Sequence, residues 1–357
     1  MKQPVVRLTL MSLIILFNCA MPHLFASAQE QQRASGALFP VEQNGKWGFI
    51  NSAGKVIIKP QFEFAYEFSE GLAAANSDGK YFYIDSTGNI VIHLDSPSSE
   101  PFSEGLAAIC VDNLWGYMNK SGEIVIKPQF EEDQTYWEMR PARRFSEGLA
   151  AVVVNDRWGY IDKSGKMVIE PQFESAEEFS EGLAVVKING KEGYIDKSGK
   201  IVIPPHYDLA VGFSEGLARV NFGFNYINST DVGYNAAKWG FIDRTGKVAI
   251  APQFAIAGTF YEGLAPVALE SGKQGYIDKT GKIIFTVNCD ASGFFSGGFA
   301  SIEIRAKRGF IDRTGRVVIP PQFDEVRHFS DGIVWVRVGN VWGYINRAGE
   351  YVWKSTG

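Results

Sequence analysis

Hydrophobic and polar residues alternate in short segments that return along the chain. After one Glu-Gly pair, Ala218, Val220 and Phe222 alternate with Arg219 and Asn221. This period of two is typical of a β-strand with one buried face and one face in water. A second and a third short hydrophobic segment follow, each after a turn sequence. No helical period is visible beyond residue 28, so we expect an all-β chain.

Two sequence markers recur in a constant register. The steps between successive Gly positions of the first marker, with Phe82 taken once in place of Gly, are 34, 34, 43, 34, 47, 35, 34 and 34 residues. A fixed period of this size predicts a stack or ring of supersecondary units. The first marker is an aromatic-containing segment ending in Ile or Met, with the copies Trp47-Gly48-Phe49-Ile50, Tyr81-Phe82-Tyr83-Ile84, Trp115-Gly116-Tyr117-Met118, Trp158-Gly159-Tyr160-Ile161, Gly193-Tyr194-Ile195, Trp239-Gly240-Phe241-Ile242, Gly275-Tyr276-Ile277, Gly309-Phe310-Ile311 and Trp342-Gly343-Tyr344-Ile345.

The second marker is Phe-Ser-Glu-Gly, first seen at residues 68–71, and a Pro-Gln-Phe often lies between the two markers. We interpret each unit as three strands, the third ended by the Pro, which has no N–H for the ladder. We expect the Trp and Gly residues of the first marker to have structural roles. The Trp is expected to pack between units, and the Gly to mark close backbone approach between neighbouring units.

These units predict an open, twisted β-solenoid or superhelix of about nine three-stranded repeats. Three strands are fewer than the four of a propeller blade, and nine units exceed the usual range of about four to eight blades. A closed, propeller-like ring is the alternative.

The two markers resemble those of the WG-repeat family of bacterial proteins, named for the Trp-Gly pair. The resemblance covers nearly the whole chain after the leader. It implies a β-rich repeat domain, commonly in exported proteins, with no single assigned activity. Glu192, Gln274 and Arg308 stand where the family has Trp. A weaker likeness is to cell-wall-binding hairpin repeats, which have a shorter period.

Residues 1–28 are predicted to be a signal peptide. A basic start with Lys2 and Arg7 precedes an apolar stretch, and Ala26-Ser27-Ala28 forms a cleavage site. Residue Asn18 precedes Cys19, where a lipid-attachment site requires a small residue. We therefore expect a protein secreted or exported to the periplasm or cell surface after cleavage near Ala28. A linker is expected at 29–40 and the repeat domain at 41–357.

Composition and motifs exclude several classes of function. Cleavage removes two cations, so the formal charge falls from −5 to −7. With no basic run, binding to nucleic acid is not expected. Stable membrane insertion is not expected either, because no segment after the leader approaches a transmembrane helix. Cys110 and Cys289 are interpreted as free thiols. The repeated Asp-x-x-Gly is explained by turn chemistry, and no metal, phosphate-loop or nucleophile motif is present. We expect no cofactor and no enzymatic activity.

Two insertions break the period, near residues 131–144 and 222–238. Insertions in repeat proteins map to loops that often lie on a binding face. Their aromatic and cationic residues are the candidate partner-binding residues: Tyr136, Trp137, Arg140, Phe224, Tyr226 and Tyr234. The predicted function is a scaffold that binds a protein or another macromolecule at the cell envelope. The alternative is a glycan or peptidoglycan binder that uses exposed aromatic rings.

Overall fold

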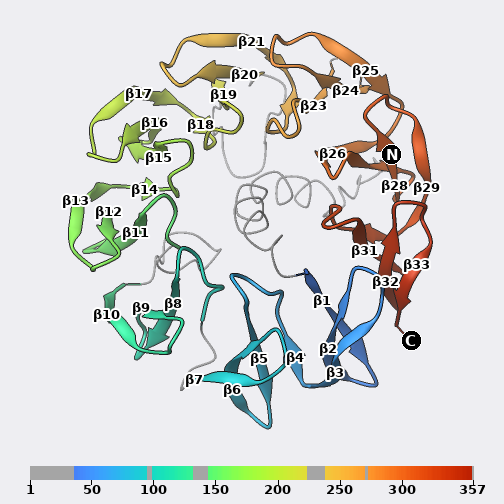
Figure 1. Cartoon of the computed structure of the whole chain (residues 1–357). Coiled ribbons are helices and arrows are strands. Elements are labelled where there is room, and N and C mark those ends of the chain that lie inside the picture. Colours follow the sequence, from blue (N-terminus) through green and yellow to red (C-terminus); the bar gives the residue numbers. More distant parts are fainter. Residues whose placement is uncertain (1–35, 95–98, 132–143, 223–237, 270–271, 356–357) are drawn as a thin grey trace, which may run out of the picture.

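The computed structural model describes residues 36–94, 99–131, 144–222, 238–269 and 272–355. These residues form nine antiparallel sheets, set around a central axis as the blades of a closed propeller (Figure 1). The strands of each blade follow chain order from the axis to the rim. The fold is therefore all-β and repetitive, as predicted, but the prediction of an open solenoid is wrong.

Blades 1 to 4 consist of β1 (Leu38–Gln43), β2 (Lys46–Asn51) and β3 (Val56–Phe62); β4 (Phe64–Ala65), β5 (Leu72–Ser77), β6 (Lys80–Asp85) and β7 (Ile90–Leu94); β8 (Leu106–Val111), β9 (Leu114–Asn119) and β10 (Ile124–Phe130); and β11 (Leu149–Val154), β12 (Arg157–Asp162) and β13 (Met167–Phe173).

Blades 5 to 9 consist of β14 (Ser175–Ala176), β15 (Leu183–Ile188), β16 (Lys191–Asp196) and β17 (Ile201–Tyr207); β18 (Leu209–Ala210), β19 (Leu217–Phe222), β20 (Lys238–Asp243) and β21 (Val248–Phe254); β22 (Ile256–Ala257), β23 (Ala265–Ala268), β24 (Gln274–Ile277) and β25 (Ile283–Val287); β26 (Ala291–Ser296), β27 (Phe299–Ile304), β28 (Lys307–Asp312) and β29 (Val317–Phe323); and β30 (Glu325–Val326), β31 (Ile333–Val338), β32 (Val341–Asn346) and β33 (Tyr351–Lys354).

A fourth strand next to the axis explains why a blade, rather than a solenoid turn, is formed. In blade 2 this strand is β4, whose two residues pair as Phe64↔Asn76 and Ala65↔Ala75. Equivalent two-residue strands open blades 5, 6, 7 and 9, and a six-residue strand opens blade 8. Two residues are too few to display a period of two, so the sequence pattern gave three strands per unit.

The first and last blades meet and close the ring. Val41 and Ile50 of blade 1 pack with Ile333 and Tyr344 of blade 9 in one buried cluster. The Tyr344 hydroxyl donates to the carbonyl of Pro40 at 3.1 Å. Several other blades have a Tyr at the position of Tyr344 whose hydroxyl donates to a backbone carbonyl. That carbonyl lies just before the Phe-Ser-Glu-Gly, or its variant, of the next blade, as in the bond from Tyr194 to Val211. At the seam, the Tyr hydroxyl makes the same kind of bond, but its acceptor is the Pro40 carbonyl of blade 1.

The Gly of the Trp-Gly pair is needed within a blade, not between blades. A Cβ added at Gly193 would lie 2.6 Å from the Ile203 oxygen and 2.7 Å from the Pro205 nitrogen of the adjacent outer strand. That strand does not end at its Pro. It continues through a bulge, so that Tyr194↔Ile203 is followed by Glu192↔Tyr207. The expectations of a Gly contact between units and of strand termination at Pro are both wrong.

The Trp side chains fill the space between blades, as predicted. Trp158 is 3 % exposed and belongs to a cluster that joins Phe173 of its own blade to Phe179 and Val186 of the next. Trp115 is also buried, against Phe130 and Phe145. Each such cluster is shared by two blades, so the hydrophobic core is distributed around the ring rather than gathered at one centre.

The Phe-Ser-Glu-Gly marker or its variant links each of blades 2 to 8 to the next blade. Ser146 Oγ donates to the Phe179 carbonyl at 2.7 Å, and the Glu147 carboxylate accepts the Gly182 N–H at 3.0 Å. Lys197, in the Asp-x-x-Gly turn of the next blade, pairs with Glu147 at 3.0 Å. We call this arrangement the clasp. The Glu therefore has an inter-blade role that turn chemistry did not predict.

The Asp-x-x-Gly turns have the predicted mechanism. Asp162 Oδ1 accepts the backbone N–H of Ser164 at 2.9 Å and of Lys166 at 3.1 Å. These bonds lower the pKa of the exposed Asp162 carboxyl, with the Ser164 side-chain bond as the largest cause. Gly165 takes the positive φ of 82° that the turn requires.

Candidate binding face

The two faces of the ring differ. One face carries the Asp-x-x-Gly turns and the clasps, and its pattern changes little from blade to blade. The other, which we call the hairpin face, carries the turns between the second and third strands of the four-stranded blades and their equivalents. Several of these are two-residue turns, at 44–45, 78–79, 112–113, 155–156, 189–190, 305–306 and 339–340.

The second insertion begins and ends at the hairpin face, whereas the first begins there at Glu131 and ends at Arg144, next to the Ser146 clasp of the other face. In blade 6, Phe222 pairs with Lys238 at the open end of the β19–β20 hairpin, where the other blades have a short turn. In blade 4, the Glu131 N–H donates to the Val153 carbonyl at 3.3 Å, next to the turn at 155–156. The insertion residues predicted to bind a partner lie outside the described residues: Tyr136, Trp137, Arg140, Phe224, Tyr226 and Tyr234.

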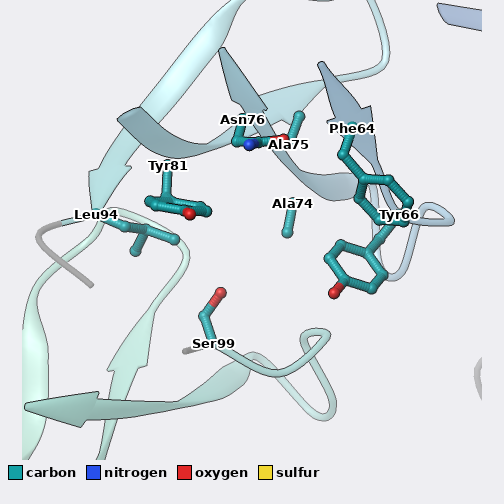
Figure 2. A pocket seen from close by; sticks show the side chains of 8 residues that line it. All are labelled: Phe64, Tyr66, Ala74, Ala75, Asn76, Tyr81, Leu94 and Ser99. Carbon is teal, nitrogen blue, oxygen red and sulfur yellow. The ribbon is translucent and has the colours of Figure 1, made fainter. Parts of the chain in front are cut away.

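A cavity of about 220 Å³ opens between blades 2 and 3, at the hairpin end of blade 2. Figure 2 shows Tyr81 and Leu94 on one side, Phe64 and Tyr66 on the other, and Ala74 between them. The lining is completed by Ala75, Asn76 and Ser99. The sequence analysis did not single out this site, although its signal was present in the irregular second copy of the first marker.

The cavity exists because blade 2 departs from the repeat. In blade 4, Trp158 pairs with Phe173, and both rings are buried in the space facing the next blade. In blade 2, Tyr81 pairs with Leu94 at the same place, and both are only half-buried. The two replacements remove side-chain volume from the interface, so the space that Trp and Phe fill elsewhere is left open.

A row of aromatic rings runs along the hairpin ends of blades 9, 1 and 2. Trp353 lies 5.0 Å from Trp342, which stacks on Trp47 at 5.7 Å across the seam. Trp47 lies 5.0 Å from Phe64, and Phe64 lies 4.9 Å from Tyr66. Phe64 is 41 % exposed and Tyr66 57 % exposed, whereas the three Trp side chains are half-buried. The row therefore emerges into solvent at the cavity.

Blade 6 carries buried polar residues next to its insertion. Arg219 and Asn221 are 7 % and 0 % exposed, at the places where blade 4 has Ala151 and Val153. The Arg219 guanidinium lies 4.9 Å above the Trp239 ring and donates to the Ala257 carbonyl. Among the described residues, the Asn221 amide has no hydrogen-bond partner. Blades 6 and 7 thus meet through polar groups where blades 4 and 5 meet through apolar ones.

A buried carboxyl lies at the interface of blades 5 and 6. Glu192 occupies a Trp position and accepts the Ala210 N–H at 2.6 Å. Burial raises the pKa of Glu192 to about 7, against the lowering effect of that bond and of Lys187. Within the described residues, no group of three or more His, Cys, Asp or Glu side chains is placed to hold a metal ion. No helix of the described residues is long and apolar enough to cross a membrane.

A second apolar feature is an exposed pair of aliphatic residues at the start of most outer strands. The pairs include Val56 with Ile57, Ile90 with Val91, Ile124 with Val125, Ile201 with Val202, Ile283 with Ile284 and Val317 with Val318. They form a belt around the rim that repeats with the blades. The departures from the repeat, by contrast, gather on the hairpin face, which makes that face the candidate binding site.

Comparison with solved structures supports the fold. A crystal structure of a eukaryotic initiation factor matches with a TM-score of 0.62 at 12 % identity, covering 90 % of this chain and 96 % of that one. BamB from Moraxella catarrhalis matches with a TM-score of 0.41 at 11 % identity, covering 88 % and 92 % of the two chains. At this identity the first similarity concerns the fold alone. None of the curated proteins matches the sequence significantly.

The family comparison agrees with the blades. The model of the WG containing repeat matches eight consecutive segments, at residues 47–81, 81–115, 115–158, 158–191, 193–223, 239–272, 275–307 and 309–342. Each matched segment runs from the strand that carries the Trp-Gly pair or its variant in one blade to the β-hairpin of the next, so the family's unit straddles a blade boundary. The chain belongs to the WG containing repeat family, and its repeats build a nine-bladed β-propeller.

Proposed function

We propose that this protein is an exported, non-enzymatic scaffold that binds another macromolecule at the cell envelope through its hairpin face. One observation carries the proposal: the places where the insertions leave the ring, the cavity and the exposed end of the aromatic row all belong to this face. A propeller supplies a rigid surface on which loops can vary, because loops contribute little to the packing between blades.

The repeated polar side chains support a structural rather than a chemical role for the repeat itself. The clasp Glu accepts a backbone N–H of the next blade, as Glu181 does from Gly216 at 3.0 Å. The Asp of the turn is held by backbone N–H groups, as at Asp243. Side chains engaged in this way leave binding to the residues that differ between blades.

Export is the part of the proposal that the leader sequence supports. The test is N-terminal sequencing of the protein recovered from the outside of the cell or from the periplasm. A new N-terminus at Gln29 supports the proposal, and a full-length cytoplasmic chain that still carries Met1 contradicts it.

The binding role is tested by trimming the insertions. One variant lacks residues 132–141 and another lacks residues 223–235. Loop closure depends weakly on loop length, so we expect nearly unchanged thermal melts for both. We also expect both to lose the partner that the intact protein captures by chemical cross-linking in the native envelope.

The aromatic insertion residues provide the finer version of this test. Substituting Ala for Tyr136, Trp137 and Tyr226 together removes the side chains that dominate interface energetics while keeping loop length. The matched control is Tyr351→Ala, which removes an exposed ring from the outer strand of blade 9. Full capture by both trimmed proteins contradicts a role for the insertions.

A glycan is the second candidate partner, and the aromatic row favours it. The exposed rings of the row, Phe64 and Tyr66, offer flat apolar surfaces, whereas rings buried between blades, such as Trp158, serve packing. A pull-down with purified cell-wall sacculus separates the two candidates. Retention of the protein on sacculus stripped of bound proteins supports the glycan.

A further inference from the structure

The cavity between blades 2 and 3 has the lining of a small-ligand site. Three aromatic rings, those of Phe64, Tyr66 and Tyr81, surround it (Figure 2). Ligand sites are lined mostly by apolar and aromatic side chains, with a few polar groups that orient the ligand. Here the polar groups are the Asn76 amide, the hydroxyls of Tyr66 and Tyr81, and the Ser99 hydroxyl, which also bonds Tyr83. No described lining residue is charged.

These groups define the ligand's chemistry. The described lining residues offer no charged partner to a carboxylate, phosphate or ammonium group, whose burial without one is costly. The Asn76 amide makes no hydrogen bond within the described part of the chain, so both its N–H donors and its oxygen are available. A ligand that fits has a flat apolar face for the rings and hydroxyl groups at its edge for the amide.

We infer that this cavity binds a neutral pyranose ring of a glycan. The inference rests on the glycan version of the proposed function and names its binding site. A pyranose carries C–H groups on its face and hydroxyls on its perimeter. The face packs on Tyr66 or Tyr81, and the hydroxyls bond Asn76 and Ser99.

The aromatic row extends the site from one sugar ring to several. From Tyr66 and Phe64, the half-buried rings of Trp47 and Trp342 continue across the seam, with neighbouring centroids between 4.9 and 5.7 Å apart. A ligand with repeated rings can contact several members of the row at once. An oligosaccharide is therefore expected to bind more tightly than a single sugar.

The experiment measures binding of a neutral tetrasaccharide of β-1,4-linked N-acetylglucosamine by calorimetry. The first variant, Tyr66→Ala, removes a ring that is 57 % exposed and so leaves packing intact. The second variant, Tyr81→Trp with Leu94→Phe, fills the cavity with the pair that blade 4 uses. The control is Tyr351→Ala. Thermal melts establish that each protein is folded.

We expect the intact protein and the control to bind the tetrasaccharide equally, and both cavity variants to bind at least tenfold more weakly. The cavity-filling variant is expected to melt no lower than the intact protein. Equal binding by every variant overturns the inference, as does an absence of binding by the intact protein. Binding of a Leu- or Trp-rich peptide in the cavity, with no competition from the tetrasaccharide, overturns it as well.

These failures are distinct from failure of the proposed function. A protein that captures an envelope partner through its insertions but ignores the tetrasaccharide overturns the sugar site alone. Loss of capture in the trimmed proteins, together with unchanged tetrasaccharide binding, supports both.

Discussion

At the residue scale, small chemical differences between equivalent positions decide what each blade does. Gly is required where a Pro bulge presses on the middle strand, and it is replaced by Phe82 in blade 2, whose outer strand pairs without that bulge. Trp and Phe fill the interface at Trp158, and Tyr81 with Leu94 leaves it open. Three predictions belong to this scale.

The first prediction compares two glycines of the same motif. Gly193→Ala brings a Cβ within 2.6 Å of the Ile203 oxygen, whereas at Gly275 the nearest atoms are 3.6 Å away because its outer strand has no such bulge. We expect Gly193→Ala to lower the free energy of unfolding by about 2 kcal/mol or more. We expect Gly275→Ala to change it by less than about 1 kcal/mol. Denaturant titration measures both, and equal losses would show that the bulge is not the cause.

The second prediction concerns the Asn221 amide, which is unpaired within the part of the chain that the structure describes. An unpaired buried polar group costs about 1–3 kcal/mol, so Asn221→Val, the residue of blade 4, is expected to stabilise the fold by an amount in that range. The reciprocal change, Val153→Asn, is expected to destabilise it. A lower melting temperature for Asn221→Val would show that the amide is satisfied in solution.

The third prediction concerns pH. Burial raises the pKa of Glu192 in the fold to about 7, above its usual value near 4.5. A raised pKa means that the fold favours the protonated form, so the protein is most stable below about pH 4.5 with respect to this group and loses stability as pH rises through 7. At pH 8 we expect Glu192→Gln to have a higher free energy of unfolding than the natural protein, by up to about 3 kcal/mol. The gain is smaller where solvent reaches the carboxylate. At pH 4 the difference should nearly vanish, and a difference independent of pH would contradict the assignment.

At the element scale, two features distinguish a propeller blade from a solenoid turn: the short inner strand within a blade and the clasp between neighbouring blades. The sequence predicted the three long strands of a unit and the Asp-x-x-Gly turn, because period-two alternation and turn chemistry are local signals. It did not predict the inner strand, because β4 has two residues and its pairing with β5 lies across a loop. Nor did it predict the clasp, because Glu147 and Gly182 are 35 residues apart.

The candidate site was predictable only in part. The insertions were visible as longer steps, but the face at which each begins follows from the strand end that it joins. The cavity depends on the absence of volume at Tyr81 and Leu94, and a missing volume can be recognised only against the filled interface of another blade.

A prediction for the clasp compares the hydrogen bond between Glu147 and the Gly182 N–H with the ion pair between Glu147 and Lys197. Glu147→Ala leaves the Gly182 N–H without its acceptor, and we expect a loss of about 1–3 kcal/mol in the free energy of unfolding. Lys197→Ala removes only a partly exposed ion pair, with an expected loss below about 1 kcal/mol. Thermal or urea melts compare the two. A larger effect of Lys197→Ala would assign the clasp to charge rather than to the backbone bond.

At the scale of the whole molecule, the repeats alone do not determine whether the chain closes into a ring. The described part of blade 1 has no inner strand, and there Arg327 of blade 9 pairs with Glu67 of blade 2 across it. The hydrophobic cluster at the seam, the Tyr344 bond and this ion pair together join residues about 300 positions apart in the chain. An open superhelix has no such contacts.

Cross-linking across the seam tests closure most directly. The variant Glu67→Cys with Arg327→Cys is treated with a short thiol-specific cross-linker at low protein concentration, and the joined peptides are identified by mass spectrometry. The matched control, Glu147→Cys with Lys197→Cys, joins adjacent blades 4 and 5 within the ring. A closed propeller predicts that both pairs cross-link within the monomer with similar yield. A control that cross-links while residues 67 and 327 do not would contradict the ring.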